Sequence, residues 1–433
     1  MDNLNIPSTN LKRVVILGGG FAGINLAKKL RKNDFQIVML DKHNYHTFIP
    51  LLYQVATAGL EPDSIAQPLR QIFKDHPHFY FRLAEAHKVN TEKQCLDTNI
   101  GSLEYDYLVI ATGSTSNYFG IENIRKQGLT MKSVPEALNL RSIILQNFEE
   151  ASLTKDLDER ERLMNFIIVG AGPTGVELAG ALAELKTHVL PRDYPDLDFR
   201  RMSIHLLEAA DKVLPPMSEH ASKHALKDLQ ELGVQVWLHT MVKDYDGQNV
   251  ITNGKNLPAS TLIWAAGVKG AVLQGFKDDE EIKGSRFVVD DYHRVNGQPN
   301  IFAVGDVAGM YSEENPKGHP MLAQVAIQQA VNLAGNLNKK SEEEWQPFHY
   351  KDLGAMATIG RNRAVADLKH AKLHGFWGWW VWMLVHLISL VGFRNKLVVL
   401  LNWFVNYFSY DRKIRLIIRP VHRKNQKVVS STN

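Results

Sequence analysis

Residues 13–23, RVVILGGGFAG, and residues 165–175, NFIIVGAGPTG, are the two stretches that decide the fold. In each, a short run rich in β-branched residues indicates a buried parallel strand, and a helix-like stretch follows. Three glycines with the spacing GxGxxG stand between strand and helix. The first permits a tight turn, the second lets the backbone approach a pyrophosphate, and the third lets strand and helix pack closely. These glycines are Gly18, Gly20 and Gly23 in the first turn and Gly170, Gly172 and Gly175 in the second.

Two such turns in one chain predict two bound dinucleotides, each with its pyrophosphate at the positive end of a helix dipole. Proteins that hold two dinucleotides usually pass a hydride or an electron pair between them. After the first turn, the strand predicted at 36–40 is followed by Asp41, which stands 18 residues beyond Gly23. A carboxylate at that place is expected to bind a ribose hydroxyl of the first nucleotide.

The second turn is followed by a matching strand at 203–207 and then by Glu208. An acid there accepts hydrogen bonds from both ribose hydroxyls and repels a 2′-phosphate, so it favours NADH over NADPH. The alternative for Glu208 is a plain surface acid at a strand end. Its separation of 33 residues from Gly175 indicates an insertion at 188–201. Arg200 and Arg201, at the end of that insertion, keep NADPH as the lesser possibility.

Composition and charge exclude several classes of protein. With 433 residues, 45% of them hydrophobic, the chain is long enough for two or three domains, and a net charge of +4 gives no indication of nucleic-acid binding. The single cysteine, Cys95, excludes a disulfide beside a flavin, so electrons must leave by another route. We expect no bound metal ion. The polar N-terminus, MDNLNIPSTN, lacks the apolar run of a signal peptide.

Strands that are followed by small residues and a glycine predict where the domains end. Residues 1–115 form the first part of one nucleotide-binding domain, which closes with the strand 107–110 and the candidate cofactor contacts Thr112 and Gly113. A second nucleotide-binding domain at 116–284 closes in the same manner, with TLIW at 261–264 before a glycine. Residues 285–365 return to the first domain, because IFAVGD at 301–306 has the form of a strand end that contacts a flavin through Asp306.

The last region, 366–433, changes character and indicates an amphipathic membrane anchor. Residues 375–393 carry no charged side chain apart from a histidine, and a second apolar run follows at 397–410. In the second run Asn402, Asn406, Ser409 and Lys413 recur on one helical face, opposite Leu400, Leu401, Phe404, Val405 and Phe408. The tryptophans at 377, 379, 380, 382 and 403 and a basic tail suit a headgroup boundary, so helices lying in one leaflet are favoured. A single span and a buried or dimer-contact helix are the alternatives.

Two further motifs carry side chains suited to redox chemistry. Glu177 follows the second glycine turn and is expected near the nicotinamide, where it could position the ring or relay a proton. A carboxylate near a helix N-terminus can equally have a purely structural role. In AQVAIQQ, residues 323–329, Gln324 and Gln328 are four apart and share a helical face. Two amides aimed into one apolar pocket can donate hydrogen bonds to a carbonyl.

These motifs resemble the two-dinucleotide-binding flavoproteins of glutathione-reductase-like fold, and among them the type II NADH:quinone oxidoreductases. The resemblance covers nearly the whole chain and implies an α/β protein with two Rossmann-like domains and a C-terminal membrane anchor. It implies one non-covalent FAD on the first turn, with Asp41 and Asp306 as contacts, and NADH on the second turn. The 323–329 stretch resembles the family's AQxAxQ quinone-site motif. Oxidation of NADH through FAD, reduction of a membrane quinone, and no proton pumping follow as expectations.

Two other functions remain open at this stage. One is an NADH-dependent reductase of a small electron-carrier protein such as ferredoxin, and the other is a non-enzymatic flavin redox sensor at the membrane. Neither alternative explains both the paired glutamines and the apolar C-terminal region. The lack of a transit peptide favours a peripheral enzyme on the cytoplasmic face of a bacterial inner membrane, and a homodimer is a further possibility.

Overall fold

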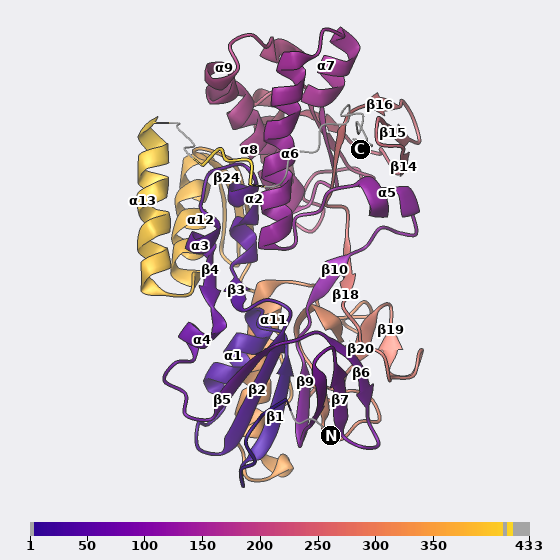
Figure 1. The fold of residues 1–433 in the computed structure, drawn as a ribbon, viewed down its shortest axis with the longest axis vertical. Helices are drawn as coiled ribbons and strands as arrows, with labels where there is room; N and C mark the ends of the chain where they lie inside the picture. The colour runs from indigo at the N-terminus through magenta and orange to yellow at the C-terminus, as the bar shows by residue number, and fades with distance from the viewer. Residues whose placement is uncertain (1–3, 410–413, 419–433) are drawn as a thin grey trace, which may run out of the picture.

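The computed structural model describes residues 4–409 and 414–418, which form two α/β halves stacked along the long axis of the molecule (Figure 1). The lower half in Figure 1 is built on a five-stranded parallel sheet with the order β21-β9-β1-β2-β5. Its strands are β1 (Lys12–Leu17), β2 (Phe35–Asp41), β5 (Phe79–Leu83), β9 (Tyr107–Ile110) and β21 (Ile301–Ala303). The strand β21 therefore brings the segment after residue 284 back to the sheet that begins the chain.

The upper half repeats this plan with a four-stranded parallel sheet in the order β13-β12-β11-β17. Its strands are β11 (Phe166–Val169), β12 (Ile204–Leu207), β13 (Gln235–Trp237) and β17 (Thr261–Trp264). All side chains of β11, β12 and β17 are buried, apart from a small exposed part of His205, because helices cover the sheet. The helices of this half are α5 (Glu122–Gln127), α6 (Val134–Leu153), α7 (Leu157–Met164), α8 (Pro173–His188), α9 (Leu190–Asp193) and α10 (Glu219–Glu231).

Helix α6 begins with a capping box that the sequence of its first turn dictates. The Ser133 hydroxyl accepts a hydrogen bond from the backbone of Glu136, and the Glu136 carboxylate accepts one from the backbone of Ser133. These bonds satisfy amides that would otherwise lack partners at the helix start. Below this helix, β10 (Ser114–Ser116) pairs antiparallel with β18 (Val268–Gly270) where the chain passes between the halves.

Shorter elements complete both halves. In the lower half, α1 (Phe21–Lys29) packs against α11 (Ala323–Leu337) on one side of the sheet. The remaining elements there are β3 (Tyr45–Thr47), β4 (Ala66–Pro68), α4 (Leu69–Ile72), β6 (Ala86–Asn90), β7 (Cys95–Thr98), β8 (Gly101–Glu104), β19 (Ile282–Lys283), β20 (Arg286–Val288), η3 (Gly305–Val307), β22 (Ala308–Gly309) and η4 (Glu342–Glu344). The segment between β3 and β4 contains η1 (Ile49–Leu51), α2 (Leu52–Ala56) and α3 (Pro62–Ile65), and it reaches the upper half, where α2 packs on α6 and α8. The upper half adds η2 (Phe199–Arg201), β14 (Val242–Tyr245), β15 (Asn249–Thr252) and β16 (Leu257–Pro258).

The C-terminal region forms a third unit beside the junction of the two halves (Figure 1). A three-stranded antiparallel sheet of β23 (Ala355–Gly360), β24 (Arg363–Leu368) and β25 (Ala371–His374) leads directly into α12 (Gly375–Ser389). A short break then leads to α13 (Phe393–Ser409). Within the described residues, no helix is both long and apolar enough to cross a bilayer.

Helix α13 has its polar face against the protein and its apolar face outward. Asn402 donates to the Glu61 carboxylate at 2.8 Å, and Asn406 donates to the Gly59 carbonyl at 3.1 Å. Phe404 and Phe408 keep 63% and 70% of their surface exposed. The predicted amphipathic helix is therefore confirmed, with two of its predicted polar residues acting as docking groups. Lys413 and most of the basic tail lie outside the described residues, while Arg415 pairs with Asp193.

Candidate active site

The first glycine turn has the geometry that its sequence predicts. Gly18 has a φ of +106°, and a Cβ placed on it would lie 2.3 Å from the carbonyl oxygen of Ala111. A Cβ on Gly23 would lie 1.9 Å from the carbonyl oxygen of Gly18, so only glycine lets the helix approach the strand. A Cβ on Gly20 would meet nothing within 4 Å. The backbone at Gly20 thus faces open space at the start of α1, where a pyrophosphate fits.

The second turn repeats this geometry almost atom for atom. Gly170 has a φ of +100°, and a Cβ there would lie 2.6 Å from the Ala265 carbonyl oxygen. A Cβ on Gly175 would lie 1.9 Å from the Gly170 carbonyl oxygen, and one on Gly172 would meet nothing within 4 Å. Both turns therefore combine a closed strand–helix contact with an open cradle at the N-terminus of a helix.

The predicted ribose carboxylates lie beside their turns. The Gly19 amide donates to Asp41 Oδ2 at 2.6 Å, and the Ala171 amide donates to Glu208 Oε2 at 2.7 Å. Glu208 also accepts from the Ala210 amide at 2.9 Å. The same loop position thus fixes both acids, each at the end of the second strand of its half. A carboxylate held there is placed to meet the sugar next to the pyrophosphate.

Arg200 and Arg201, which left NADPH as an alternative to NADH, each pair with a carboxylate close by. The Arg200 guanidinium makes two hydrogen bonds to Asp198, two residues before it, and Arg201 pairs with Glu161 of α7. Both guanidinium groups are therefore paired with carboxylates other than Glu208.

The region of Asp306 contains two polar groups that sequence reasoning missed. Asp306 Oδ2 accepts from the Ser114 hydroxyl at 2.6 Å, and that hydroxyl oxygen accepts from Lys132 Nζ at 2.8 Å. Burial lowers the pKa of Lys132, while Asp306 and Glu136 act to raise it. Neither Lys132 nor Ser114 belongs to a recognisable motif, because a chain of side chains from residues 114, 132 and 306 exists only after folding. This half-buried lysine and the open cradle at Gly20 fit an anionic, extended cofactor such as FAD.

Thr112 and Gly113, the other predicted cofactor contacts of the first half, follow β9 directly. The Thr112 hydroxyl donates to the Ala271 carbonyl at 2.7 Å and so ties the end of β9 to the segment after β18. Gly113 has a φ of +68°, and a Cβ there would meet nothing within 4 Å. The backbone at Gly113 therefore also faces open space.

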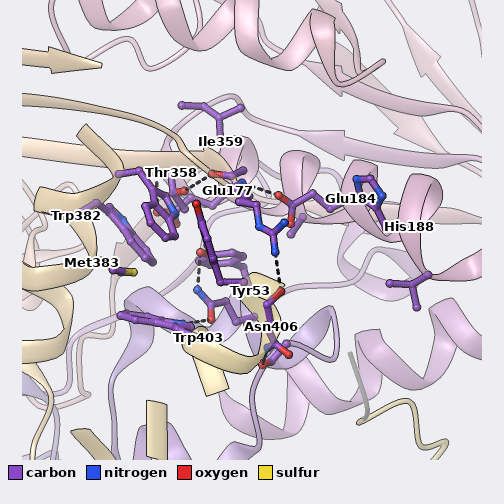
Figure 2. Close-up of a pocket in the computed structure, with 18 residues that line it drawn as sticks. Tyr53, Glu177, Glu184, His188, Thr358, Ile359, Trp382, Met383, Trp403 and Asn406 are labelled. Atoms are coloured by element: carbon purple, nitrogen blue, oxygen red, sulfur yellow. Dashed lines mark hydrogen bonds between the residues drawn. The ribbon is translucent and has the colours of Figure 1, made fainter. Parts of the chain in front are cut away.

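Glu177 is buried on α8 and lines a pocket between the upper half and the C-terminal region (Figure 2). Burial raises its pKa to about 8; the Thr358 amide, 3.5 Å from the carboxylate, and the nearby Trp382 indole act in the opposite direction. The carboxyl is therefore largely protonated at neutral pH and can donate a proton. The approach of α8 to β23 depends on Gly180, where a Cβ would lie 1.7 Å from the Ile359 carbonyl oxygen.

The opposite wall of this pocket comes from α2 and from α13 (Figure 2). The Trp403 indole donates to Gln54 Oε1 at 2.8 Å, and Gln54 donates to the Tyr53 hydroxyl at 2.8 Å. Trp382 stacks on His386 with ring centroids 4.3 Å apart and is almost fully buried. The sequence assigned Trp382 and Trp403 to a headgroup boundary, but these two rings face inward and build the pocket. Tryptophan spacing alone does not distinguish the two environments.

Gln324 and Gln328 do share one face of α11, and both contact the segment that leads to β23. The Gln328 amide donates to the Lys351 carbonyl at 2.8 Å and accepts from the Lys351 amide at 3.0 Å. Gln324 bonds in the same way to the Gly354 carbonyl and the Leu353 amide, both at 3.0 Å. The two side chains thus hold the backbone of residues 351–354 in place. Each side-chain NH2 group uses one of its two hydrogens in these bonds, and a role as donors to a quinone remains a prediction.

Comparison with known proteins defines first the class and then the family. The family model described as "Pyridine nucleotide-disulphide oxidoreductase" matches residues 12–330, and the model "NDH2 C-terminal domain" matches residues 353–410. The first match agrees with the two glycine turns and the repeated α/β plan. Because Cys95 is the only cysteine, the chain cannot form the internal disulfide that this description mentions.

The individual proteins that the chain resembles are NADH:quinone and NAD(P)H-ubiquinone oxidoreductases. The chain is 35% identical to the type II NADH:quinone oxidoreductase Ndh of Mycobacterium tuberculosis, covering 92% of this chain and 89% of the relative. It is 30% identical to the mitochondrial internal alternative NAD(P)H-ubiquinone oxidoreductase A1 of Arabidopsis thaliana, over 94% and 86%. The solved structure of NDH2 from Plasmodium falciparum with NADH has a TM-score of 0.86 and 22% identity, over 94% and 100%, and so shares the fold.

The chain therefore belongs to the type II NADH:quinone oxidoreductases. The expected fold is confirmed: two Rossmann-like domains and a C-terminal unit with amphipathic helices. So is the expected enzyme class, an FAD-dependent NADH dehydrogenase that reduces a quinone without pumping protons. The comparisons do not favour the ferredoxin-reductase and redox-sensor alternatives.

Proposed function

We propose that FAD binds at the Gly18–Gly23 turn, that NADH binds at the Gly170–Gly175 turn, and that the quinone approaches the pocket containing Glu177. When bound, FAD supplies the redox chemistry, since it takes a hydride from NADH and passes two electrons on. The observation that carries the proposal is the position of Glu177. It lies on the helix that starts at the NADH turn, yet its carboxyl lines a pocket walled by the C-terminal helices.

Glu177 acts in this proposal as the proton donor to the reduced quinone. Its pKa of about 8 keeps the carboxyl protonated at neutral pH, and Trp382 and Trp403 line the same pocket. Reduction of a quinone to a quinol needs two electrons and two protons. The hydride of NADH accounts for both electrons and one proton, and Glu177 would supply the other proton and take one back from solvent. The hydrogen bonds of Gln324 and Gln328 to residues 351–354 position the strap that leads into β23 and so shape the same region.

We infer that the C-terminal helices hold this pocket at a lipid surface. The outward faces of α12 and α13 carry exposed apolar side chains: Phe376, Trp377, Trp380, Leu384, Ile388, Leu397, Leu400, Leu401, Phe404 and Phe408. An apolar patch of this kind, on helices too short to span, suits burial in one leaflet. A second copy of the chain is the alternative cover for that face. Attachment to the cytoplasmic side of a bacterial inner membrane, homodimer formation, and the domain limits at 115, 284 and 365 stay predictions.

NADH is the proposed electron donor because Glu208 lies at the NADH turn and Arg200 and Arg201 are paired elsewhere. A 2′-phosphate next to a fixed carboxylate would meet a group of like charge.

Stopped-flow absorbance of the flavin tests the proposal. Under anaerobic conditions, one equivalent of NADH should bleach the flavin of the detergent-solubilised enzyme, and a short-chain quinone should then restore the colour rapidly. Bleaching without recovery would overturn the quinone pocket and direct the search to a protein acceptor. Absence of bleaching would overturn the assignment of NADH to the second turn.

A further inference from the structure

Three histidines from distant parts of the chain meet at the edge of the C-terminal unit, away from the pocket of Glu177. His220 and His224 lie one turn apart on α10, and His374 ends β25 at the start of α12. One ring nitrogen of each lies within 4.8 Å of those of the other two. The rings of His224 and His374 stack with centroids 3.9 Å apart. The expectation that the chain binds no metal overlooked the HxxxH spacing of His220 and His224.

The hydrogen bonds of these rings leave nitrogen atoms free to bind a ligand. His224 Nδ1 bonds to the His220 carbonyl oxygen at 2.8 Å, so Nε2 is the ring nitrogen that this bond leaves for a ligand. This arrangement, in which one ring nitrogen bonds to a backbone carbonyl, is the usual support for a metal-binding imidazole. His220 Nδ1 is buried without any hydrogen-bond partner among the described residues. An unpaired buried nitrogen is costly unless a ligand satisfies it.

The backbone around the cluster is held by independent contacts. Asp367 of β24 accepts hydrogen bonds from the amide and the hydroxyl of Ser218, the N-cap of α10, at 2.7 and 2.8 Å. Arg363 of the same strand reaches Asp228 and Glu231 near the other end of α10. These contacts fix α10 against β24, and β24 pairs with β25 in a register that places Val365 opposite His374. The three rings are therefore brought together by the fold and need no metal to meet.

We propose that His220, His224 and His374 form a binding site for a divalent transition-metal ion, with zinc as the best match, that joins the NADH-binding half to the start of the C-terminal helices. Imidazole nitrogens suit zinc, which binds them at about 2.0–2.1 Å in tetrahedral geometry. Ligand atoms around such an ion are about 3.4 Å apart, so each distance between the ring nitrogens has to shorten by about 1.4 Å or less. A fourth position stays open to water, and the nearby Asp228 carboxylate adds negative charge that offsets Lys227.

A metal in this site would act as a clamp. His374 is the N-cap of α12, whose Trp382 and Met383 line the pocket of Glu177. An ion shared between α10 and His374 would restrain the end of the β24–β25 hairpin and the first turn of α12. Binding energy gained only in this closed arrangement would stabilise the docked C-terminal unit.

Calorimetric titration of the holoenzyme with zinc chloride tests the site. The protein should carry no polyhistidine tag and should first be treated with a chelator. We expect one zinc ion per chain with a dissociation constant in the micromolar range or below. His374→Ala, at an exposed position, should weaken binding roughly 30-fold or more, since even indirect supports of a metal contribute 10- to 100-fold. His87→Ala, an exposed histidine of β6, should leave the affinity unchanged.

Cobalt provides a second measurement. Co²⁺ in the same site should give the visible bands of a tetrahedral ion in the wild-type enzyme and in His87→Ala, and these bands should be lost in His374→Ala and in His224→Ala. Flavin absorbance of each variant checks that the holoenzyme has folded. No stoichiometric binding to the wild type, or binding unchanged in His374→Ala, would overturn the proposal.

Discussion

The two glycine turns of this enzyme are nearly superimposable in their contacts, yet the helices that follow them meet different surroundings. After the first turn, Asn25 stands two residues beyond the last glycine, and its amide closes on the Phe21 carbonyl of its own helix at 2.8 Å. After the second turn, the equivalent residue is Glu177, buried beside a pocket. Helix α1 is covered by α11, whereas α8 is covered by β23 and faces the C-terminal helices.

This difference separates the features that bind a nucleotide from those that take part in the reaction. The turn determines that a dinucleotide can bind, because glycine geometry, an open cradle and a helix N-terminus are all that a pyrophosphate needs. The element that packs on the following helix determines what else the site can do. A side-chain amide closed on its own helix, as at Asn25, suits a half that only has to bind its nucleotide. A protonated carboxyl exposed to a pocket suits the half through which electrons and protons pass.

The largest effect is expected from substitution of the last glycine of each turn. Gly23→Ala and Gly175→Ala each place a methyl group 1.9 Å from a carbonyl oxygen and force the helix off the strand. Gly23→Ala should yield protein with almost no flavin. Gly175→Ala should keep its flavin but lose about 100-fold or more in the rate of flavin reduction by NADH. The measurements are the flavin-to-protein absorbance ratio and stopped-flow reduction.

The comparison between the turns would fail if these two effects were exchanged or were identical. Loss of flavin from both variants would mean that the upper half supports FAD binding as much as the lower half does. Gly335→Ala in α11, where a Cβ meets nothing within 4 Å, serves as the control for an alanine in a helix beside the site.

Glu177→Gln should slow reoxidation of the flavin by quinone about 100-fold relative to its reduction by NADH, which is the scale of a lost general acid. Flavin reduction by NADH should change little, while reoxidation by quinone should slow. In the wild type, reoxidation should be constant at low pH and fall above about pH 8, because Glu177 then loses its proton. The Gln variant should lack that fall, and Glu177→Asp, which keeps an acid, should restore part of the rate. Equal slowing of both half-reactions would assign Glu177 a structural role.

The same carboxyl also links stability to pH. Its folded pKa of about 8 lies above the ordinary value of 4.5, so the folded state binds more protons than the unfolded state between these values. The free energy of unfolding should therefore fall as pH rises from about 4.5 to about 8 through this group. Denaturant titrations of Glu177→Gln should show a shallower pH dependence over that window. An unchanged slope would mean that Glu177 titrates normally.

The exposed face of α13 provides the next test. Phe404→Glu combined with Phe408→Glu should weaken binding to anionic phospholipid vesicles about 10- to 100-fold, because two apolar anchors are lost and two like charges are added. Glutamates at Leu83 and Leu153, which are exposed but lie outside α12 and α13, are the matched control. Vesicle flotation measures the binding. If the double variant still floats but its oligomeric state changes, this face is covered by a second copy of the chain.

The sequence predicted the parts of the site that are local and missed those that depend on folding. Glycine turns and the acids that end each second strand are close in sequence, so Asp41 and Glu208 could be placed directly. Lys132, Ser114 and Asp306 come from three separate segments, and no spacing connects them. Tryptophan in an apolar helix suits lipid or protein equally, which is why Trp382 and Trp403 were placed at the membrane. The paired glutamines were correctly assigned to one face, but the backbone strap that they bind was not foreseen.

The smallest effect is expected at the acids beside the turns, where the comparison is closest. Glu208→Gln keeps the hydrogen bond from the Ala171 amide but removes the charge that repels a 2′-phosphate. Discrimination between NADH and NADPH, taken as the ratio of their kcat/KM values, should fall about 10-fold, mainly through a lower KM for NADPH. The equivalent Asp41→Asn should not alter that ratio, because Asp41 serves the first turn. If Asp41→Asn changed the nucleotide preference and Glu208→Gln did not, NADH would bind at the first turn and FAD at the second.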